Sequence, residues 1–326
     1  MDLFVTGGNG FIGRALVSRL SQLGHRVSCL VRNPGRADWM RSCPGLAPVV
    51  GNLLAPDSYR TAIGQAEIVF HLAGLTKART RAEYLATNGE ATGWLAEAAS
   101  APGSRVKKIV YVSSLAVAGP HRAASPARED EEPRPITHYG ESKLLGEELL
   151  RRYCGGTTWA VLRPAVVYGP FDRDVLQYFR AAARGFVPLL GGGKLELSLL
   201  HVADLVEALT LAAFSKRSDG RVYFVSDGQL HTTGEVAAVL RELVGRARVV
   251  PVAGAVLRLA GLVGDLVGAA TGKAALLNSQ KAREALQEGW VCSIERIRAE
   301  LGFAPRIDLA SGFRATFGWY RESGWM

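Results

Sequence analysis

The stretch Thr6-Gly7-Gly8-Asn9-Gly10-Phe11-Ile12-Gly13 decides the fold of this chain. It follows an apolar run, residues 3–5, that predicts a buried strand, and it precedes residues 14–23, whose periodicity predicts an amphipathic helix. Its glycines match G-x-G-x-x-G and also the looser G-x-x-G-x-x-G. One glycine permits the tight turn, the next lets a diphosphate approach the backbone, and the last lets helix and strand pack closely. A glycine-rich turn of a flavodoxin-like domain without a dinucleotide is the alternative at this point.

The bulk composition is that of a globular protein. With 326 residues, the chain could form two domains or one large domain with a lobe attached, and 48% hydrophobic residues suffice for a core. No signal-type leader precedes the first strand, so we expect a cytoplasmic protein. The four cysteines are far apart and form no C-x-x-C pair, which predicts reduced thiols and no metal site; they are Cys29, Cys43, Cys154 and Cys292.

The formal net charge of +9 is spread along the chain. No basic run or interleaved aromatic pattern accompanies it, so we expect no nucleic-acid partner. A basic surface suits an anionic cofactor and equally the anionic face of a membrane.

The end of the second predicted strand, residues 26–31, selects the cofactor. In NAD-binding βαβ units this position carries a carboxylate for the adenosine ribose. The tip here is Val31-Arg32-Asn33, without a carboxylate, and Arg32 can hold a 2′-phosphate through charge-assisted hydrogen bonds. A solvated arginine at a strand end is the alternative. We therefore expect NADP(H), with NAD less favoured.

Further strands are expected over residues 47–50, 68–70, 107–112 and 159–163, and they alternate with helices. This alternation predicts a parallel sheet with ligands at its carboxyl edge. Asn52 follows the third strand, where its amide could pair with the adenine edge. His71 follows the fourth strand and is expected to be a core histidine. The helix expected over residues 81–99 carries Asn88, either on its surface or facing the site.

Tyr139 and Lys143 stand at the head of a helix expected to run to about Arg152, after a proline-rich loop over residues 119–138. The i to i+4 spacing puts both side chains on one helix face. A phenol has an ordinary pKa of ~10, and it becomes a useful proton donor near neutral pH when a nearby ammonium lowers that pKa. Tyr139 is therefore the candidate general acid/base and Lys143 its electrostatic partner, although a Tyr/Lys pair alone is common by chance.

Together these motifs resemble the extended short-chain dehydrogenase/reductase family, also described as the NAD-dependent epimerase/dehydratase family. The chain resembles the dihydroflavonol-reductase and 3-beta-hydroxysteroid-dehydrogenase-like members, and its Val31-Arg32 tip is similar to that of the NADP-using dihydroflavonol-reductase-like ones. Asn52 and Ala118 depart from the Asp and Tyr that the family often has. The other matching stretches run in order up to residue 204: His71-Leu72-Ala73-Gly74, Tyr139 with Lys143, Arg163-Pro164, Val167-Tyr168-Gly169-Pro170 and His201-Val202-Ala203-Asp204.

The resemblance implies an α/β fold, a doubly wound parallel sheet (Rossmann) with a smaller C-terminal substrate lobe. Residues 1–165 would bind NADP and residues 166–326 would form the lobe, with parts of about 200–230 returning to the main sheet. The implied catalytic residues are Ser114, with Ser113 as the close alternative, Tyr139 and Lys143, which also anchors the ribose. The expected cofactor-binding residues are Gly7, Gly10, Phe11, Ile12, Gly13, Arg32, Asn33, Asn52, Leu53, Leu72, Ala73, Gly74, Tyr139, Lys143 and Pro164.

The C-terminal half predicts helices over residues 172–184, 201–214, 253–270, 293–301 and 309–321, a strand over 221–225, and a helix capped by Thr232 or Thr233 that reaches Val244. Residues 253–270 are apolar but contain Arg258 and Asp265. A buried helix is expected there, with a peripheral membrane contact as the alternative.

Three functions follow from these observations. The favoured one is an NADP(H)-dependent oxidoreductase acting on a small-molecule ketone or secondary alcohol of apolar, sterol-, isoprenoid- or acyl-like character. A nucleotide-sugar epimerase or dehydratase is the alternative, although residues 197–200 lack an arginine that would suit a diphosphate. A non-catalytic NADP-binding subunit or redox sensor is the third. The apolar residues of the lobe could equally form its own core. The sequence does not decide whether the protein is a homodimer.

Overall fold

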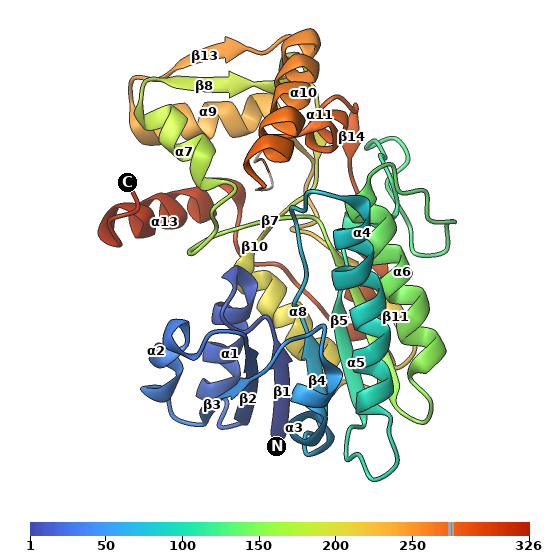
Figure 1. Ribbon diagram of the computed structural model, residues 1–326. Helices are drawn as coiled ribbons and strands as arrows, with labels where there is room; N and C mark the ends of the chain where they lie inside the picture. Colours follow the sequence, from blue (N-terminus) through green and yellow to red (C-terminus); the bar gives the residue numbers. More distant parts are fainter. Residues whose placement is uncertain (273–274, 276) are drawn as a thin grey trace.

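Seven parallel strands form the main sheet of the computed structural model, which describes all residues except 273, 274 and 276 (Figure 1). The strand order is β11-β6-β5-β4-β1-β2-β3. This order is that of a doubly wound sheet, and it confirms the predicted Rossmann fold. The strands are β1 (Asp2–Thr6), β2 (Arg26–Val31), β3 (Leu46–Val50), β4 (Ile68–His71), β5 (Lys108–Val112), β6 (Thr158–Pro164) and β11 (Arg221–Val225).

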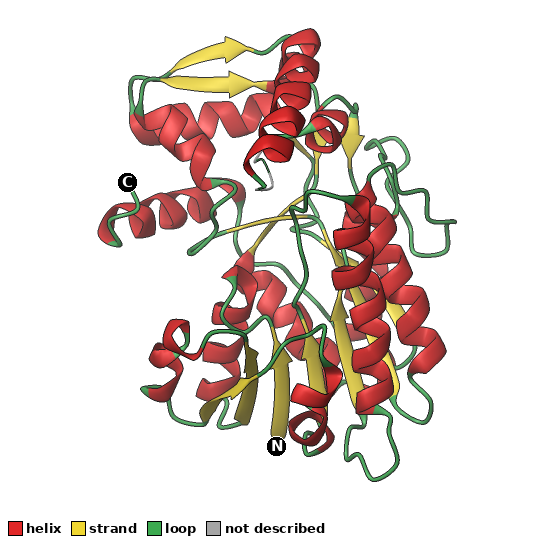
Figure 2. Cartoon of the chain, viewed as in Figure 1, coloured by secondary structure: helices red, strands yellow, loops and turns green. Residues whose placement is uncertain are grey.

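Helices cover both faces of this sheet because side chains alternate along each strand (Figure 2). Leu3 and Val5 of β1 pack on one face with α1 (Phe11–Gln22) and α8 (Val202–Phe214), to which α2 (Asp38–Arg41) and α12 (Glu295–Leu301) add. Phe4 packs on the other face with α3 (Arg60–Gly64), α5 (Ala91–Ala99) and α6 (His138–Tyr153). The strand order reverses between β1 and β4, so the crevice for a ligand opens at their carboxyl ends.

A smaller lobe lies beyond the carboxyl edge of the sheet, in the upper part of Figure 1. Much of it surrounds a core of its own, which includes Phe179, Leu240 and Phe313. The chain leaves it to add α8 and β11 to the main body and then returns. Its elements are β7 (Val166–Tyr168), α7 (Leu176–Ala183), β8 (Phe186–Leu189), β9 (Glu196–Leu197), β10 (Leu199–His201), β12 (His231–Thr232), α9 (Thr233–Val244), β13 (Arg248–Pro251), α10 (Gly254–Thr271), α11 (Ser279–Ala285), β14 (Gly289–Trp290) and α13 (Leu309–Glu322).

Two helices differ from the sequence prediction. The helix expected over residues 172–184 begins only at Leu176, because the Asp172 carboxylate accepts hydrogen bonds from the backbone N–H groups of Asp174 and Val175 and holds a turn there. The helix expected over residues 81–99 consists of α4 (Arg81–Tyr84), a π-helical segment over Leu85–Glu90, and α5. The N-cap of α9 is Thr232, which forms a capping box with Glu235.

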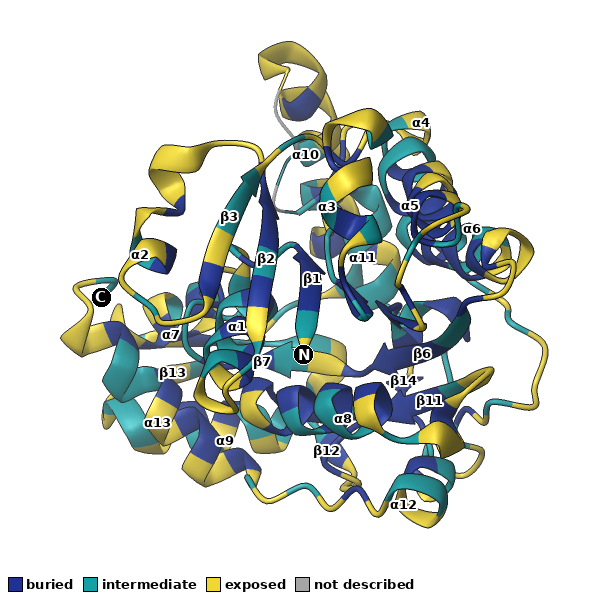
Figure 3. Ribbon diagram, turned by 90° about the horizontal axis from the view of Figure 1, so that it is seen from below, coloured by how far each residue is buried: buried dark blue, intermediate teal, exposed yellow. Residues whose placement is uncertain are grey.

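The expectation of a buried helix over residues 253–270 is wrong. These residues do form a helix, α10, but only 17% of its 18 residues are buried (Figure 3). By length and composition alone, with a mean hydropathy of 1.4, it is apolar enough to cross a membrane. The apolar pattern was correct for a helix, whereas it could not show which side of the helix would be covered.

Candidate functional site

The glycine turn, residues 7–13, forms a concave backbone surface, the glycine cradle, which side chains at the glycine positions would fill. Gly7 has a φ of 75°, in the left-handed region that glycine favours. A Cβ on Gly13 would lie 2.0 Å from the carbonyl oxygen of Gly7, so no other residue fits there without a shift of the backbone. Gly10 is the N-cap of α1 and provides no side-chain cap. The N–H groups at the start of α1, including those of Phe11 and Ile12, are therefore available to an anion such as a diphosphate.

The residues expected at the adenosine end lie along the tips of β2 and β3. Arg32 is exposed directly after β2, whereas the side chain of Asn33 accepts a hydrogen bond from the N–H of Gly35 and caps a short 3-10 turn. Asn52 accepts a hydrogen bond from the N–H of Leu54 through its Oδ1 atom, and Leu53 is buried. Arg32 is thus an exposed cation at the tip, while Asn33 also has a local structural role.

The end of β4 is held by buried polar contacts. The Thr6 hydroxyl lies 2.7 Å from Nδ1 of His71 and accepts a hydrogen bond from the N–H of Ala73. His71 is fully buried, and burial lowers its pKa to about 3, so the expected core histidine is confirmed. These bonds fix the backbone of Leu72, Ala73 and Gly74 beside the glycine turn, where a Cβ on Gly7 would lie 2.8 Å from the nitrogen of Ala73.

Asn88 is buried and faces inward, which resolves the two placements left open by the sequence. Its Oδ1 atom accepts the N–H of Leu75 at 2.7 Å, and its Nδ2 atom donates to the carbonyl of Leu75 and to the Ser142 hydroxyl, each at 2.9 Å. A Cβ on Gly74 would approach this Oδ1 atom to 2.9 Å. Asn88 therefore connects the loop after β4 to helix α6, which carries the Tyr/Lys pair.

The two serines after β5 have different surroundings. The Ser113 hydroxyl is buried and donates to a carboxylate oxygen of Glu147 at 2.6 Å. Ser114 is only half-buried and lies beside Tyr139, where its hydroxyl favours a lower pKa of the phenol. Its hydroxyl also accepts the N–H of Ala116 at 3.1 Å. The structure thus brings together Ser114 and Tyr139 and leaves Ser113 to the core.

Tyr139 and Lys143 lie on the same face of α6, but their electrostatics differ from expectation. Burial raises the pKa of Tyr139 to about 12, against a smaller lowering by the nearby Ser114 hydroxyl. Burial lowers the pKa of Lys143 to about 7, and Glu147 opposes this shift. Nζ of Lys143 donates to the carbonyl of Val112 at 2.7 Å. The expectation that Lys143 lowers the pKa of Tyr139 is therefore wrong for this structure, because the cost of burial dominates at both groups.

Sequence reasoning missed the buried acid on this helix. Glu147 is one further turn along α6 from Lys143 and is fully buried. It accepts two hydrogen bonds from Arg163, at 2.9 and 2.8 Å, besides that from Ser113. The signal was present as the i, i+4, i+8 spacing of Tyr139, Lys143 and Glu147.

Helix α11, from the distant C-terminal half, covers the head of α6. The side-chain oxygen of Gln280 accepts the N–H of His138 at 3.0 Å, and the Thr137 hydroxyl donates to Glu284 at 3.3 Å. Nζ of Lys281 lies 5.8 Å from the ring centre of Tyr139. No sequence motif marks these residues, yet they contact the first residues of α6 and place Lys281 beside the candidate proton donor.

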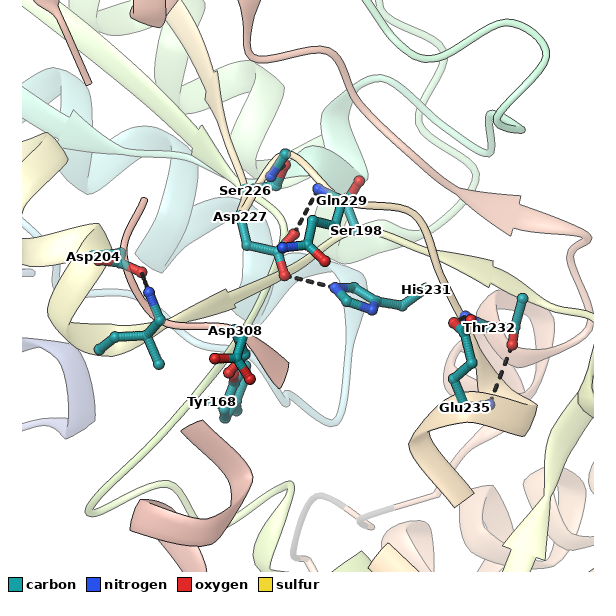
Figure 4. Close-up of polar contacts among 12 residues, drawn as sticks. Tyr168, Ser198, Asp204, Ser226, Asp227, Gln229, His231, Thr232, Glu235 and Asp308 are labelled. Carbon is teal, nitrogen blue, oxygen red and sulfur yellow. Dashed lines mark hydrogen bonds and ion pairs between the residues drawn. The ribbon is translucent and has the colours of Figure 1, made fainter. Parts of the chain in front are cut away.

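A second polar cluster follows β11 (Figure 4). Asp227 and His231, both buried, pair at 2.6 Å, and Asp204 accepts the backbone N–H groups of Arg306 and Ile307. The Asp227–His231 pair holds the loop after β11, and Asp204 fastens residues 306–307 to the start of α8. Leu199 and Leu200, in the stretch without an arginine, are buried in hydrophobic cores. At these two positions the apolar composition reflects the protein's own core.

A parallel sheet with a dinucleotide cradle and a Tyr/Lys pair at its carboxyl edge defines an enzyme that uses a nicotinamide dinucleotide. The chain belongs to the NAD dependent epimerase/dehydratase family, whose model matches residues 3–226. This is the family of extended short-chain dehydrogenases/reductases, so the predicted enzyme class is confirmed.

Characterised relatives include reductases. The chain is 31% identical over 325 residues to ceramide reductase of Caulobacter vibrioides, covering 99% of this chain and 95% of the relative. It is 33% identical over 233 residues to the 4-hydroxy-2-methyl-3-oxo-4-farnesyl-3,4-dihydroquinoline-1-oxide ketoreductase of Stigmatella aurantiaca, covering 70% and 69%. Among solved structures, MoeE5 in complex with UDP-glucose and NAD superposes with a TM-score of 0.78 at 27% identity over 99% of each chain.

Proposed function

We propose that this protein is an NADP(H)-dependent oxidoreductase that transfers a hydride between the nicotinamide and a ketone or secondary alcohol on an apolar, lipid-like small molecule. The observation that carries the proposal is that α6 places Lys143, with Tyr139 one turn before it, beside the loop after β4: a Cβ on Gly74 would lie 3.4 Å from Nζ of Lys143. The same loop borders the glycine cradle, and Ser114 lies beside Tyr139. In the proposal, residues 1–165 bind the cofactor in a cytoplasmic enzyme, and residues 166–326 shape the substrate site.

Each residue of the site has its own role in carbonyl reduction. When bound, the dinucleotide supplies the hydride. Ser114 holds the substrate oxygen, and Tyr139 donates its hydroxyl proton to that oxygen as negative charge develops there. Because burial raises the pKa of Tyr139 to about 12, the phenol carries its proton at neutral pH, which is the state that reduction requires. Lys143 lies one turn along α6 from Tyr139, and a Cβ on Gly74 would lie 3.4 Å from its Nζ atom. In this position Lys143 anchors the ribose.

Binding of the cofactor rests on the cradle and on Arg32. The N–H groups of Phe11, Ile12 and Gly13 at the start of α1 would bind the diphosphate, while the N–H of Gly10 closes the glycine turn by donating to the carbonyl of Gly7 at 2.9 Å. Gly7 and Gly10 would let the diphosphate approach the backbone, and Leu72 to Gly74 together with Pro164 would contact the nicotinamide half. Arg32, exposed and without an acidic neighbour in sequence, holds the 2′-phosphate. Asn33, Asn52 and Leu53 border the adenosine.

The substrate class is proposed from relatives rather than from composition of the lobe. The names of the two reductase relatives specify a ceramide and a farnesyl-bearing quinoline, both largely apolar molecules. Val166, just past Pro164, remains 43% exposed, so an apolar side chain is available at the sheet edge. An apolar ligand contacting such surfaces gains roughly 25 cal/mol per Å² of area removed from water.

The alternative is a nucleotide-sugar epimerase or dehydratase, which the solved relative with UDP-glucose and NAD favours. Native mass spectrometry of the purified protein, followed by NADPH oxidation with a panel of hydrophobic ketones, separates the two. We expect exchangeable NADPH and steady turnover of long-chain ketones. A co-purifying nucleotide sugar with tightly held NAD, and no consumption of NADPH, would establish the alternative instead.

A further inference from the structure

Helix α10 presents a continuous apolar face to solvent. Six large aliphatic side chains on it are between 49% and 71% exposed. At about 100° per residue they fall within an arc of about 140° on one side of the helix, which contains no charged residue. Soluble proteins seldom leave such a stripe uncovered. These residues are Val256, Leu259, Leu262, Val263, Leu266 and Val267.

The opposite side of α10 is built for close packing against the protein. Its buried residues are Leu257, Gly261 and Gly268. A Cβ on Gly261 would lie 3.0 Å from Ala282 of α11, and a Cβ on Gly264 would lie 1.9 Å from the carbonyl oxygen of Leu277. The glycine side thus fixes α10 on α11 and directs the leucine and valine side outward.

The geometry points to a helix that lies on a bilayer rather than one that crosses it. The 18 residues of α10, about 27 Å long, fall within the range of a spanning helix, but one side of α10 is occupied by α11, so lipid cannot surround it. Arg258 and Asp265 both lie beside one edge of the apolar face, where Asp265 accepts a hydrogen bond from the Ser279 hydroxyl of α11. A helix with one wide exposed apolar side and a charged edge is of the type that binds in the membrane interface.

Charge favours an anionic bilayer over a second copy of this chain. The protein carries a formal net charge of +9, so two copies repel one another, whereas anionic phospholipids attract it. Arg184, Arg246 and Arg248 are exposed where strand β13, which leads into α10, pairs with β8. Within the part of the chain that the structure describes, neither they nor Arg258 form an ion pair with an acidic side chain.

We propose that the exposed face of α10 docks the enzyme on the surface of an anionic phospholipid bilayer. The same contact would place the reaction site near the membrane, because α11 packs against α10 and also bonds to the head of α6 beside Tyr139. A lipid-like substrate could then reach Tyr139 from the bilayer. Docking itself does not depend on the proposed reductase activity.

Co-sedimentation of the full-length protein with vesicles tests the proposal. The vesicles contain phosphatidylcholine alone or phosphatidylcholine mixed with phosphatidylglycerol. We expect binding to the mixed vesicles, and a loss of at least about tenfold in partitioning for the double variant Leu259→Glu/Leu266→Glu, since buried apolar area drives the insertion. The matched control is Leu23→Glu, which changes a leucine 42% exposed at the far end of α1.

Thermal melting and NADPH binding show that each variant is folded. Equal partitioning of the wild type and the double variant would overturn the proposal. So would a wild type that ignores both vesicles but forms a dimer that the double variant dissolves, because α10 would then be a self-association face. Stronger binding to the mixed vesicles that weakens with added salt supports the electrostatic part of the proposal.

Discussion

Arg163, at the end of strand β6, holds Glu147 of helix α6 in a two-pronged ion pair with N–O distances of 2.9 and 2.8 Å, and both side chains are almost completely buried. The pair joins the helix that carries Tyr139 and Lys143 to the central sheet. Glu147 also gives Ser113 an acceptor and opposes the lowering of the Lys143 pKa, in which burial is the larger cause. The ion pair thus fastens α6 to the sheet, and its carboxylate has a smaller effect on the charge of Lys143.

Glu147→Gln should lower the free energy of unfolding by about 3 kcal/mol, because Arg163 would keep its charge in the interior without a carboxylate partner. Chemical denaturation measures this change. The matched control is Glu148→Gln, one residue further along and exposed, which should stay within about 0.5 kcal/mol of the wild type. Equal effects of the two substitutions would contradict the importance of the ion pair.

Tyr139→Phe should reduce kcat/KM for ketone reduction by at least about 10²-fold, since it removes only the proton donor. NADPH affinity, followed by fluorescence, should remain nearly unchanged. Tyr153→Phe, at the exposed end of the same helix, controls for the loss of a phenol. Retention of most activity by Tyr139→Phe on the true substrate would exclude the proposed mechanism.

Lys143→Met should abolish activity but stabilise the cofactor-free protein at low pH. Burial lowers the pKa of Lys143 to about 7, below its ordinary value of 10.5, so the unfolded chain binds more protons between these two pH values. The stability that Lys143 costs is therefore largest below pH ~7 and is regained as pH rises toward ~10. Melting temperatures at pH 6 and pH 9 should show a gap between variant and wild type that narrows at pH 9. A gap independent of pH would contradict this assignment; Lys107→Met, at an exposed lysine, is the control.

Arg32→Ala should weaken NADPH binding by about 10- to 100-fold, the equivalent of about 1.5 to 3 kcal/mol for charged hydrogen bonds, and leave NADH binding nearly unchanged. Fluorescence titration with both cofactors measures the difference. Arg41→Ala, in α2 with an exposed side chain paired to Asp38, is the matched control. Equal affinities of the wild type for NADPH and NADH would refute the choice of cofactor.

The sheet and its carboxyl edge could be predicted because they depend on short-range patterns. The glycine turn, the apolar strands and the Tyr139/Lys143 spacing each specify local geometry within a few residues. The role of Asn88 was less accessible, because a π-helical segment over Leu85–Glu90 alters the phase of its helix. The contacts of α11 were beyond such reasoning, since His138 and Gln280 lie 142 positions apart.

Two expectations failed because composition does not specify surroundings. An apolar helix has the same sequence pattern whether protein or solvent covers it, and α10 is covered only on its glycine side. Similarly, the spacing of Tyr139 and Lys143 indicated an electrostatic pair, whereas the direction of each pKa depends on burial, which only the tertiary structure reveals.

The position of β11 at the edge of the sheet affects how the protein can be made. This strand spans Arg221–Val225 and pairs with β6, yet the chain builds β7 to β10 and α8 between the two. During synthesis, residues up to 225 must therefore leave the ribosome before β11 can cover the edge of β6. By then α8 can also shield one face of the sheet. A nascent chain cut at residue 165 would expose that apolar face, so we expect it to need chaperones or to aggregate.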